Sequence, residues 1–316
     1  MKQIVIFSEN DGWHEQRLAN AFRRYGAHAQ VVSLKECRIG FEHSQTGLCI
    51  PGFTDTLPDA VFVRAVAAGS FEEVTFRLDI LHALKLSGVV VYNDAVSIER
   101  TVDKGMTSFL LMQNRIPAPP VWVCEHAEAA HNVIHEQLEK GRSVVQKPLF
   151  GNCGRGLQLI DSGEYQLDAE MINGVYYLQQ FIDQDDHNGR DWRVFVINHQ
   201  AVAAMERISE HWVTNRARGG KCLPAVLTPA LRRLAEAASK ATGILYGGVD
   251  IIRDTQGEYL VLEVNSVPAW RGLQTVCPTD ISDLLARDLL ERPPVIPAQA
   301  PFTDQRTETR KFAVPE

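Results

Sequence analysis

The sequence lacks any apolar stretch that approaches the roughly 20 residues needed to cross a membrane. It also lacks a signal-peptide pattern, because Met1 to Phe7 runs directly into residues typical of a β-strand. Its 6 cysteines are scattered without the short paired spacings of a zinc site or a disulfide framework. We therefore expect a cytoplasmic protein with no membrane partner and with reduced thiols.

An excess of basic residues is missing as well. Lys and Arg number 32 against 39 Asp and Glu, which gives a formal net charge of -7. General nucleic-acid binders normally carry the opposite balance in order to neutralise phosphates, so we expect no nucleic-acid partner. The 316 residues, 45% of them hydrophobic, are enough for two or three packed subdomains.

The first 95 residues alternate between strand-like and helix-like patterns, which predicts a Rossmann-like α/β domain with a mainly parallel sheet. The loop after the first strand has no G-x-G-x-x-G motif, which argues against a dinucleotide site. The expected strands are Gln3 to Phe7, His28 to Leu34, Val61 to Val63 and Val89 to Tyr92, and the expected helices are Glu15 to Tyr25 and Phe71 to Leu86.

A single helix is predicted from Ser97 to Gln113, and the prolines of Ile116 to Pro120 end it. Mixed α+β patterns follow, so we divide the chain into residues 1–95, 96–185 and 186–292, with a proline-rich flexible tail over 293–316. The later expected elements are helices Ala127 to Glu139 and Pro229 to Thr242, strands Ser143 to Pro148, Leu157 to Ile160, Val175 to Ile182, Asp191 to Ile197 and Ala201 to Ile208, and a hairpin over Val249 to Asn265.

The hairpin carries a candidate metal site. A tight turn would place Asp250 opposite Val261, and the alternation of strand side chains then brings Glu263 and Asn265 to the same face. Carboxylate and amide oxygens are ligands that Mg²⁺ prefers. An exposed strand face with two incidental acids is the alternative.

Two lysines are candidate phosphate ligands. Lys147 ends an apolar strand immediately before a loop with Gly151, Gly154 and Gly156, whose backbone can approach a phosphate closely. The loop is not a Walker motif, and a plain hairpin turn remains open. Lys104 adds a second basic group, for which a solvated helix face is the alternative. The strand end Gln179 to Ile182 can hold a flat adenine through its backbone, or be simply a buried strand.

In chain order these motifs resemble the ATP-grasp superfamily, and specifically the RimK-like glutamate ligases. The resemblance covers roughly residues 60 to 290 and implies a pre-ATP-grasp domain followed by two subdomains that grip ATP. The motifs are Asp103-Lys104, Ile116-Pro117-Ala118-Pro119, Gln146-Lys147-Pro148 with its glycine loop, Gln179-Gln180-Phe181-Ile182, Asp191-Trp192-Arg193-Val194-Phe195-Val196, Thr214-Asn215-Arg216-Ala217-Arg218-Gly219-Gly220, Gly248-Val249-Asp250-Ile251 and Leu262-Glu263-Val264-Asn265.

The resemblance also implies roles for individual residues. ATP would be held at its phosphates by Lys104, Lys147 and the three loop glycines, at adenine by Gln180, Phe181 and Ile182, and at ribose by Asp191. Asp250, Glu263 and Asn265 would bind one or two Mg²⁺ or Mn²⁺ ions, and Arg193, Arg207 and Arg218 would stabilise the transferred phosphoryl group. From their positions, Arg64 and Arg271 are candidates for a substrate carboxylate, although ordinary surface arginines are an equal alternative.

The implied function is an ADP-forming carboxylate–amine ligase that works through an acyl phosphate. Glutamate would be joined to a peptide or a small cofactor, and a homo-oligomer is compatible with the sequence. The chain departs from the family at Val213, where a basic residue is common, and in the loop Val267 to Gly272, which is usually built of small residues. Three alternatives stay open: another ATP-grasp ligase or phosphotransferase, such as a peptide or D-amino-acid ligase, a non-catalytic ATP-binding module, and a structural scaffold.

Overall fold

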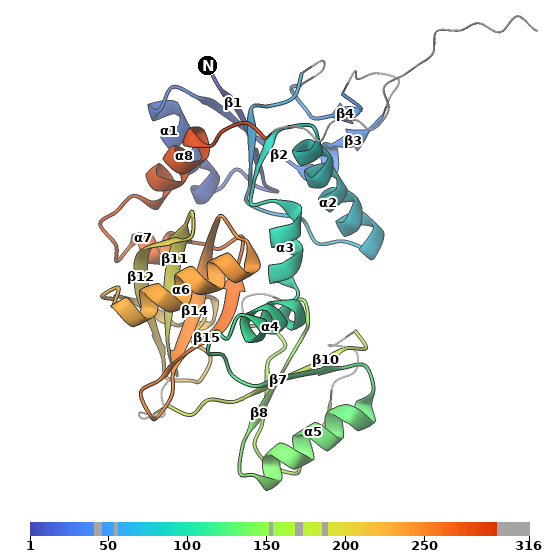
Figure 1. Ribbon diagram of the computed structural model, residues 1–316, viewed down its shortest axis with the longest axis vertical. Helices are drawn as coiled ribbons and strands as arrows, with labels where there is room; N and C mark the ends of the chain where they lie inside the picture. Colours follow the sequence, from blue (N-terminus) through green and yellow to red (C-terminus); the bar gives the residue numbers. More distant parts are fainter. Residues whose placement is uncertain (41–45, 54–55, 152–153, 168–172, 185–188, 296–316) are drawn as a thin grey trace, which may run out of the picture.

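The computed structural model describes residues 1–40, 46–53, 56–151, 154–167, 173–184 and 189–295. Three main sheets follow one another along the long axis of the molecule (Figure 1). From residue 296 on, the expected tail lies outside the described residues. Within the described ranges, no helix has the length and apolar character required to cross a membrane.

The N-terminal sheet is parallel and has the strand order β2-β1-β5-β6. Residues 4–7 and 60–63 of its central strands are apolar and buried, as expected for a sheet with both faces covered, so the Rossmann-like prediction is confirmed. The elements are β1 (Gln3–Phe7), α1 (Trp13–Arg24), β2 (His28–Val32), η1 (Leu34–Glu36), β3 (Arg38–Ile39), β4 (Leu48–Cys49), β5 (Ala60–Val63), α2 (Phe71–Leu86) and β6 (Val90–Tyr92).

The single helix expected from Ser97 to Gln113 is wrong, because the chain forms α3 (Ala95–Val102) and α4 (Lys104–Gln113). Asp103 separates them in an extended conformation, with φ of -82° and ψ of 104°. Its carboxylate accepts a hydrogen bond from the Met106 amide, which caps the start of α4. The break places Lys104 at the first position of a helix rather than in the middle of one.

The central sheet is antiparallel, in the order β7-β10-β8-β9, and α5 packs against it at one end of the molecule (Figure 1). Ala130 and Ile134 of α5 are buried with Val144 and Leu178 of the sheet. The elements are β7 (Val121–Cys124), α5 (Ala127–Glu139), β8 (Val144–Lys147), β9 (Gln158–Ile160) and β10 (Tyr176–Gln180).

The C-terminal sheet has the order β13-β12-β11-β14-β15, with antiparallel pairing throughout. Leu231, Ala235 and Ala238 of α6 are buried against one face, and the other face carries the polar residues of the candidate site. The elements are β11 (Gly189–Ile197), β12 (Gln200–Ser209), η2 (Arg216–Arg218), β13 (Lys221–Pro224), α6 (Pro229–Thr242), β14 (Tyr246–Arg253), β15 (Tyr259–Asn265), α7 (Arg271–Gln274) and α8 (Ile281–Glu291).

One hydrophobic cluster joins the N-terminal and C-terminal sheets. Phe62 and Tyr92 of the first sheet pack against Tyr246 of β14, with ring centroids 4.8 and 5.1 Å from the Tyr246 ring. Helix α8 returns from the end of the described chain to lie beside α1 (Figure 1), and Arg17 of α1 pairs with Asp280 at 2.9 Å. The two sheets therefore share a core and are expected to unfold together.

Phe62→Ala is expected to lower the free energy of unfolding by about 3–5 kcal/mol, because it leaves a cavity in the cluster shared by both sheets. Urea unfolding followed by tryptophan fluorescence measures this change. The matched control is Phe71→Ala, since Phe71 is 83% exposed at the start of α2. Equal effects from the two variants would contradict a shared core.

Candidate functional site

The pairing of β14 with β15 brings the two acidic residues of the hairpin directly together. A β-bulge leaves Leu262 without a partner, so Asp250 faces Glu263 and Gly248 faces Asn265. The expected placement of Asp250 opposite Val261 is therefore wrong, because the turn is one residue longer than a tight turn, with Arg253 facing Tyr259, and the bulge adds a second residue. Together they move the partner of Asp250 from Val261 to Glu263, a direct cross-strand relation.

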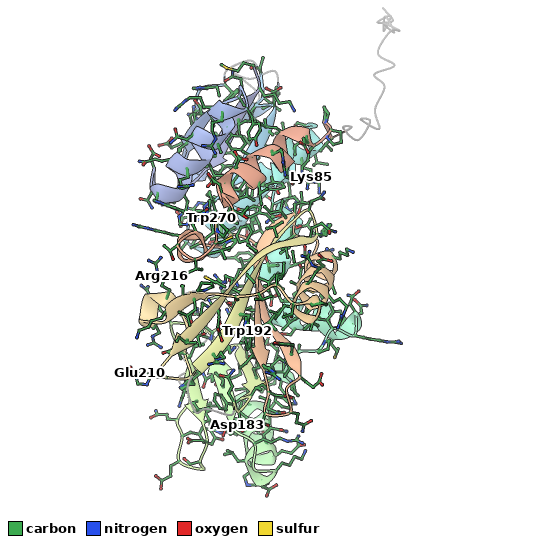
Figure 2. The ribbon with its side chains drawn as sticks, turned by 90° about the vertical axis from the view of Figure 1, so that its left-hand side faces the viewer. Lys85, Asp183, Trp192, Glu210, Arg216 and Trp270 are labelled. Carbon is green, nitrogen blue, oxygen red and sulfur yellow. The ribbon has the colours of Figure 1, made fainter. Side chains whose placement is uncertain are left out.

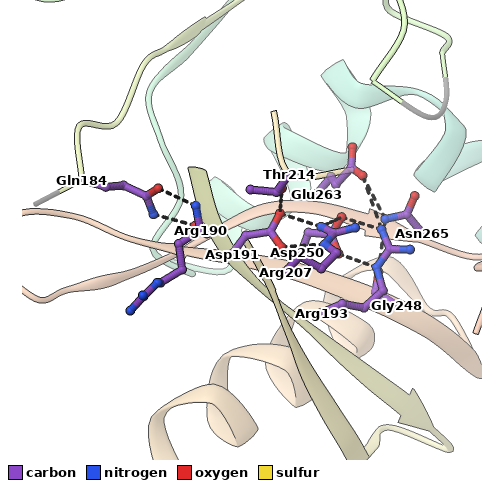
Figure 3. A network of polar contacts seen from close by, with 10 residues as sticks. All are labelled: Gln184, Arg190, Asp191, Arg193, Arg207, Thr214, Gly248, Asp250, Glu263 and Asn265. Carbon is purple, nitrogen blue, oxygen red and sulfur yellow. Dashed lines mark hydrogen bonds and ion pairs between the residues drawn. The ribbon is translucent and has the colours of Figure 1, made fainter. Parts of the chain in front are cut away.

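Asp250 belongs to a buried network of alternating charges (Figure 3). Arg193 binds both of its oxygens, with Nε to Oδ1 and Nη2 to Oδ2 each at 2.6 Å. Arg207 binds both oxygens of Asp191 at 2.6 Å and also reaches Asp250 Oδ2 at 2.9 Å. Thr214 donates to Asp191 at 2.5 Å. Two arginines thus balance two carboxylates on the face of β11, β12 and β14.

The network keeps Asp250 and Arg207 ionised although both are buried. Burial on its own raises the pKa of Asp250, but the charges of Arg193 and Arg207 bring that pKa well below its ordinary value. Burial lowers the pKa of Arg207, yet the carboxylates of Asp250 and Asp191 raise it above its ordinary value. A charged partner is what makes each of these buried ions tolerable.

The network changes what can be expected of Asp191 and Arg207. Both are only 4% exposed, and the oxygens of Asp191 are occupied by Arg207 and Thr214. Arg207 binds Asp250 as well as Asp191, so Asp191 and Arg207 form a buried group that contacts Asp250.

The residues at the hairpin fit a hard cation. Asn265 donates its amide to Glu263 Oε1 at 3.1 Å, which leaves its oxygen for a metal, and the Glu263 side chain is 33% exposed. Asp250 Oδ1 receives one hydrogen bond where a carboxylate oxygen can accept about two. The described part of the chain contains no cluster of three or more His, Cys, Asp or Glu residues suited to a metal. The candidate set is therefore two acids and an amide, with other positions left to phosphate oxygens and water.

Two lysines face this hairpin from the central subdomain. Lys147 Nζ donates to Gln179 Oε1 at 2.6 Å, and burial lowers its pKa to about 8 against the opposing effect of Glu263. Lys104 Nζ donates to the Gly151 carbonyl at 3.1 Å. Burial also lowers the pKa of Lys104, and the charge of Glu263 opposes this shift only in part. The shared influence of Glu263 puts both ammonium groups within electrostatic range of the candidate metal site. Gln179, as the partner that orients Lys147, was not foreseen.

The glycine loop contacts the segment Thr214 to Gly220, and Asn152 and Cys153 of the loop lie outside the described residues. Gly154 has a φ of +67°, and a Cβ atom there would lie 2.6 Å from Asn215 Oδ1 and 3.1 Å from Val213 Cγ1. Arg218 donates to the Gly154 carbonyl at 3.1 Å. Only glycine allows this approach, so loop and segment form one wall, with Val213 in direct packing range.

The end of β10 uses its first backbone donors within the protein. The Gln180 amide bonds to the Pro120 carbonyl, and the Phe181 amide bonds to the Ser143 carbonyl, both at 2.9 Å. The Phe181 ring meets Trp212 edge-on at 6.0 Å. The backbone N–H groups of Gln180 and Phe181 are therefore already used within the protein.

Arg64 and Arg271 lie beside a group of aromatic rings at the junction of the N-terminal and C-terminal sheets. The rings are those of Trp13, His14 and Trp270. Trp270, labelled in Figure 2, is fully buried. Arg64 donates to the Pro268 carbonyl at 3.1 Å and stacks 5.0 Å from the Trp270 ring. Arg271 is exposed and stacks 6.0 Å from Trp13. Burial, with Arg64 and Arg271, lowers the pKa of His14 to about 4, so its neutral ring accepts the Trp270 amide.

The comparisons with known proteins cover nearly the whole chain. Residues 101–289 match the family model of the RimK-like ATP-grasp domain, and residues 1–98 match that of the RimK PreATP-grasp domain. The tetrahydromethanopterin:alpha-L-glutamate ligase of Methanococcus maripaludis is 34% identical over 300 residues, which are 91% of this chain and 98% of that protein. A probable alpha-L-glutamate ligase 2 of Hahella chejuensis is 30% identical over 305 residues, covering 92% of this chain and 97% of that protein.

Solved structures share the fold at lower identity. The ATP-grasp ligase PsnB, complexed with a minimal precursor, Mg and ADP, has a TM-score of 0.69 and 21% identity, and the match covers 91% of this chain and 97% of that one. D-cycloserine synthetase DcsG has a TM-score of 0.66 and 17% identity, with 92% and 99% covered. At these identities the likeness establishes the three-dimensional arrangement of the chain.

Arg207→Met is expected to lower the free energy of unfolding by about 3–5 kcal/mol, because it leaves Asp191 buried without its counter-charge. Arg24→Met is the matched control, since the pair between Arg24 and Asp283 is exposed and contributes at most about 1 kcal/mol. Urea unfolding of both variants measures the difference. A similar loss of unfolding free energy in the two variants would show that the buried network stabilises the fold no more than an exposed ion pair does.

The affinity for ATP is expected to fall by up to about tenfold between pH 7 and pH 9. The reason is that Lys147, with a pKa of about 8, loses its positive charge over this range; Glu263 and Asp250 favour the charged form, and Lys104 disfavours it. Calorimetric titration with ATP at several pH values measures the fall. Lys147→Arg keeps its charge and is expected to show a flat profile, so a parallel fall in that variant would contradict the assignment.

Proposed function

This chain belongs to the RimK-like ATP-grasp family and is an ATP-dependent ligase, and we propose that it joins the amino group of glutamate to a carboxylate of a small molecule. One observation carries the proposal: Asp250 and Glu263 face each other beside Asn265, within the electrostatic range of Lys104 and Lys147. Relatives that match this chain over nearly its full length are named as glutamate ligases, which favours glutamate as the amine.

The nucleotide is proposed to lie between residues 96–185 and 186–292, with the domain of residues 1–95 completing the substrate side. Its phosphates are proposed to lie beside the ammonium groups of Lys104 and Lys147 and the backbone of the glycine loop. Its adenine is proposed to lie at the end of β10. The proposed contacts are Lys104, Lys147, Gly151, Gly154 and Gly156 for the phosphates, and Gln180, Phe181 and Ile182 for the adenine.

Asp250, Glu263 and Asn265 are proposed to hold Mg²⁺ or Mn²⁺, and two ions are proposed because the phosphates add further oxygen ligands. When bound, the cation neutralises charge on the phosphate oxygens. Arg193 and Arg207 act through Asp250: they fix its orientation and keep it ionised. Asp191 in turn fixes Arg207, a positioning role in place of the ribose contact.

The reaction needs no covalent bond to the protein. A substrate carboxylate oxygen attacks the γ-phosphorus of ATP, the bond to the bridging oxygen of ADP breaks, and an acyl phosphate forms. The glutamate amine then attacks the acyl carbon, phosphate leaves, and the nitrogen loses a proton as the amide forms. Lys104, Lys147 and the exposed Arg218 supply positive charge to the phosphoryl group, so catalysis rests on positioning and electrostatics.

The carboxylate substrate is proposed to bind where the loop after Asn265 meets the N-terminal domain. Arg271 is exposed there, whereas Arg64 holds the loop through the Pro268 carbonyl. Pro268 is also close to the metal hairpin, because a Cβ on Gly248 would lie 3.2 Å from Pro268 Cβ.

A cytoplasmic location is proposed for this reaction. The five cysteines among the described residues are free thiols.

Incubation with Mg²⁺, ATP, glutamate and a panel of small-molecule, peptide and D-amino-acid substrates, followed by mass spectrometry, tests the proposal. We expect a small-molecule acid to gain the mass of a glutamyl residue, with ADP and phosphate released. Glu263→Gln is expected to lower this rate on the order of 10²-fold or more, because it removes an anionic ligand that binds the metal.

Glu258→Gln, in the exposed turn of the same hairpin, is the matched control and is expected to keep full activity. Product formation by Glu263→Gln at the wild-type rate would overturn the metal assignment. Exclusive modification of a peptide would overturn the small-molecule assignment, and exclusive use of a D-amino acid in place of glutamate would overturn the glutamate assignment; either result leaves the metal assignment intact.

A further inference from the structure

Asn93 follows β6 in the N-terminal domain, yet its side chain makes all its hydrogen bonds to the C-terminal sheet. Its Nδ2 donates to the carbonyl oxygens of Tyr246 and Ser266, each at 2.7 Å. Its Oδ1 accepts from the amides of Leu245 and Tyr246, at 2.6 and 3.2 Å. The residue is fully buried, so these four bonds occur without competition from water.

The two segments joined by Asn93 are the open end of the hairpin that carries the candidate metal residues. Tyr246 is the first residue of β14, and Ser266 directly follows Asn265, the last residue of β15. The turn that connects the strands lies at the opposite end, beyond Arg253. The last pair of the ladder, Gly248 with Asn265, is therefore secured on its open side by the Asn93 amide.

Only a side-chain amide of this length satisfies the arrangement. Asparagine offers two N–H donors and an oxygen with two lone pairs, and all four are used here. Aspartate would keep the acceptor but set a negative oxygen against two carbonyls. Serine can donate to only one strand, so it cannot bridge the pair.

The backbone that carries Asn93 is itself held firmly. The Tyr92 ring stacks on Tyr246 with an interplanar angle of 16°, and its hydroxyl donates to Asp288 of α8 at 2.6 Å. Tyr246 in turn donates its hydroxyl to the Val63 carbonyl of β5. The N-terminal sheet thus provides a rigid support from which Asn93 reaches the hairpin.

We propose that Asn93 is a positioning residue for the metal site. By bridging Tyr246 and Ser266 it sets the spacing of β14 and β15 where Asp250 and Asn265 must meet the same cation. This inference rests on the proposed metal role of the hairpin. It assigns to the N-terminal domain a part in cation binding in addition to any contact with the substrate.

Titration of Mn²⁺ in the presence of ADP, followed by electron paramagnetic resonance, tests the proposal without turnover. Asn93→Asp is expected to raise the Mn²⁺ dissociation constant by about tenfold or more, because partners that orient metal ligands contribute effects of this size. Binding of ADP without metal is expected to stay within about twofold of the wild type. Asn93→Ser provides a smaller and uncharged variant with the same expected direction.

Ser97→Ala is the matched control, because the buried Ser97 hydroxyl also crosses to the C-terminal subdomain, donating to the carbonyl of Gly243 at the end of α6 at 2.9 Å, so its hydrogen bond does not reach β14 or β15. It is expected to leave Mn²⁺ affinity unchanged, while circular dichroism verifies that each variant is folded. Wild-type Mn²⁺ affinity in folded Asn93→Asp or Asn93→Ser overturns the role of Asn93 alone. Absence of Mn²⁺ binding by the wild type with ADP overturns the metal trio itself, and Asn93 with it.

Discussion

The candidate site depends on one buried ion, the guanidinium of Arg207, which lies between the carboxylates of Asp191 and Asp250. A carboxylate as deeply buried as Asp250 is costly unless positive charge meets it, and Arg193 of β11 and Arg207 of β12 supply that charge. The arginines hold Asp250 ionised but leave capacity on Oδ1 for a further cation. A strand arrangement of this kind makes a rigid, preformed anionic centre before any ligand arrives.

Positive charge on the other side of the site comes from a different part of the chain. Lys104 and Lys147 belong to α4 and β8, and their pKa values are lowered because the fold partly removes them from water. Phosphate would favour the charged form of both lysines, whereas a metal ion would relieve the repulsion between Asp250 and Glu263. A Mg²⁺-nucleotide would therefore complement both parts of the site: its phosphates match the two lysines, and its cation matches the two carboxylates.

The N-terminal domain participates in this architecture through packing and through single polar residues. Phe62 and Tyr92 share a core with Tyr246, and Asn93 closes the open end of the β14–β15 hairpin. Arg64 holds the Pro268 carbonyl in the loop that follows the metal residues. The loop Val267 to Gly272, which departs from the family pattern, is also held by the buried side chain of Trp270. Arg271 of the same loop is exposed and is available to a substrate.

Sequence patterns determined most helices and strands and the parallel N-terminal sheet, because these depend on local periodicity, and the order of the motifs indicated the family by resemblance. The patterns also placed Asp250, Glu263 and Asn265 on one face, since strand side chains alternate. Only the tertiary structure decided the register, because a turn one residue longer than expected and a bulge at Leu262 together shift it by two residues, which no periodicity reveals. The break at Asp103, the pairing of Arg207 with two distant carboxylates and the bonds of Asn93 were likewise hidden from sequence. They join residues far apart in the chain or depend on a single side chain whose neighbours exist only after folding.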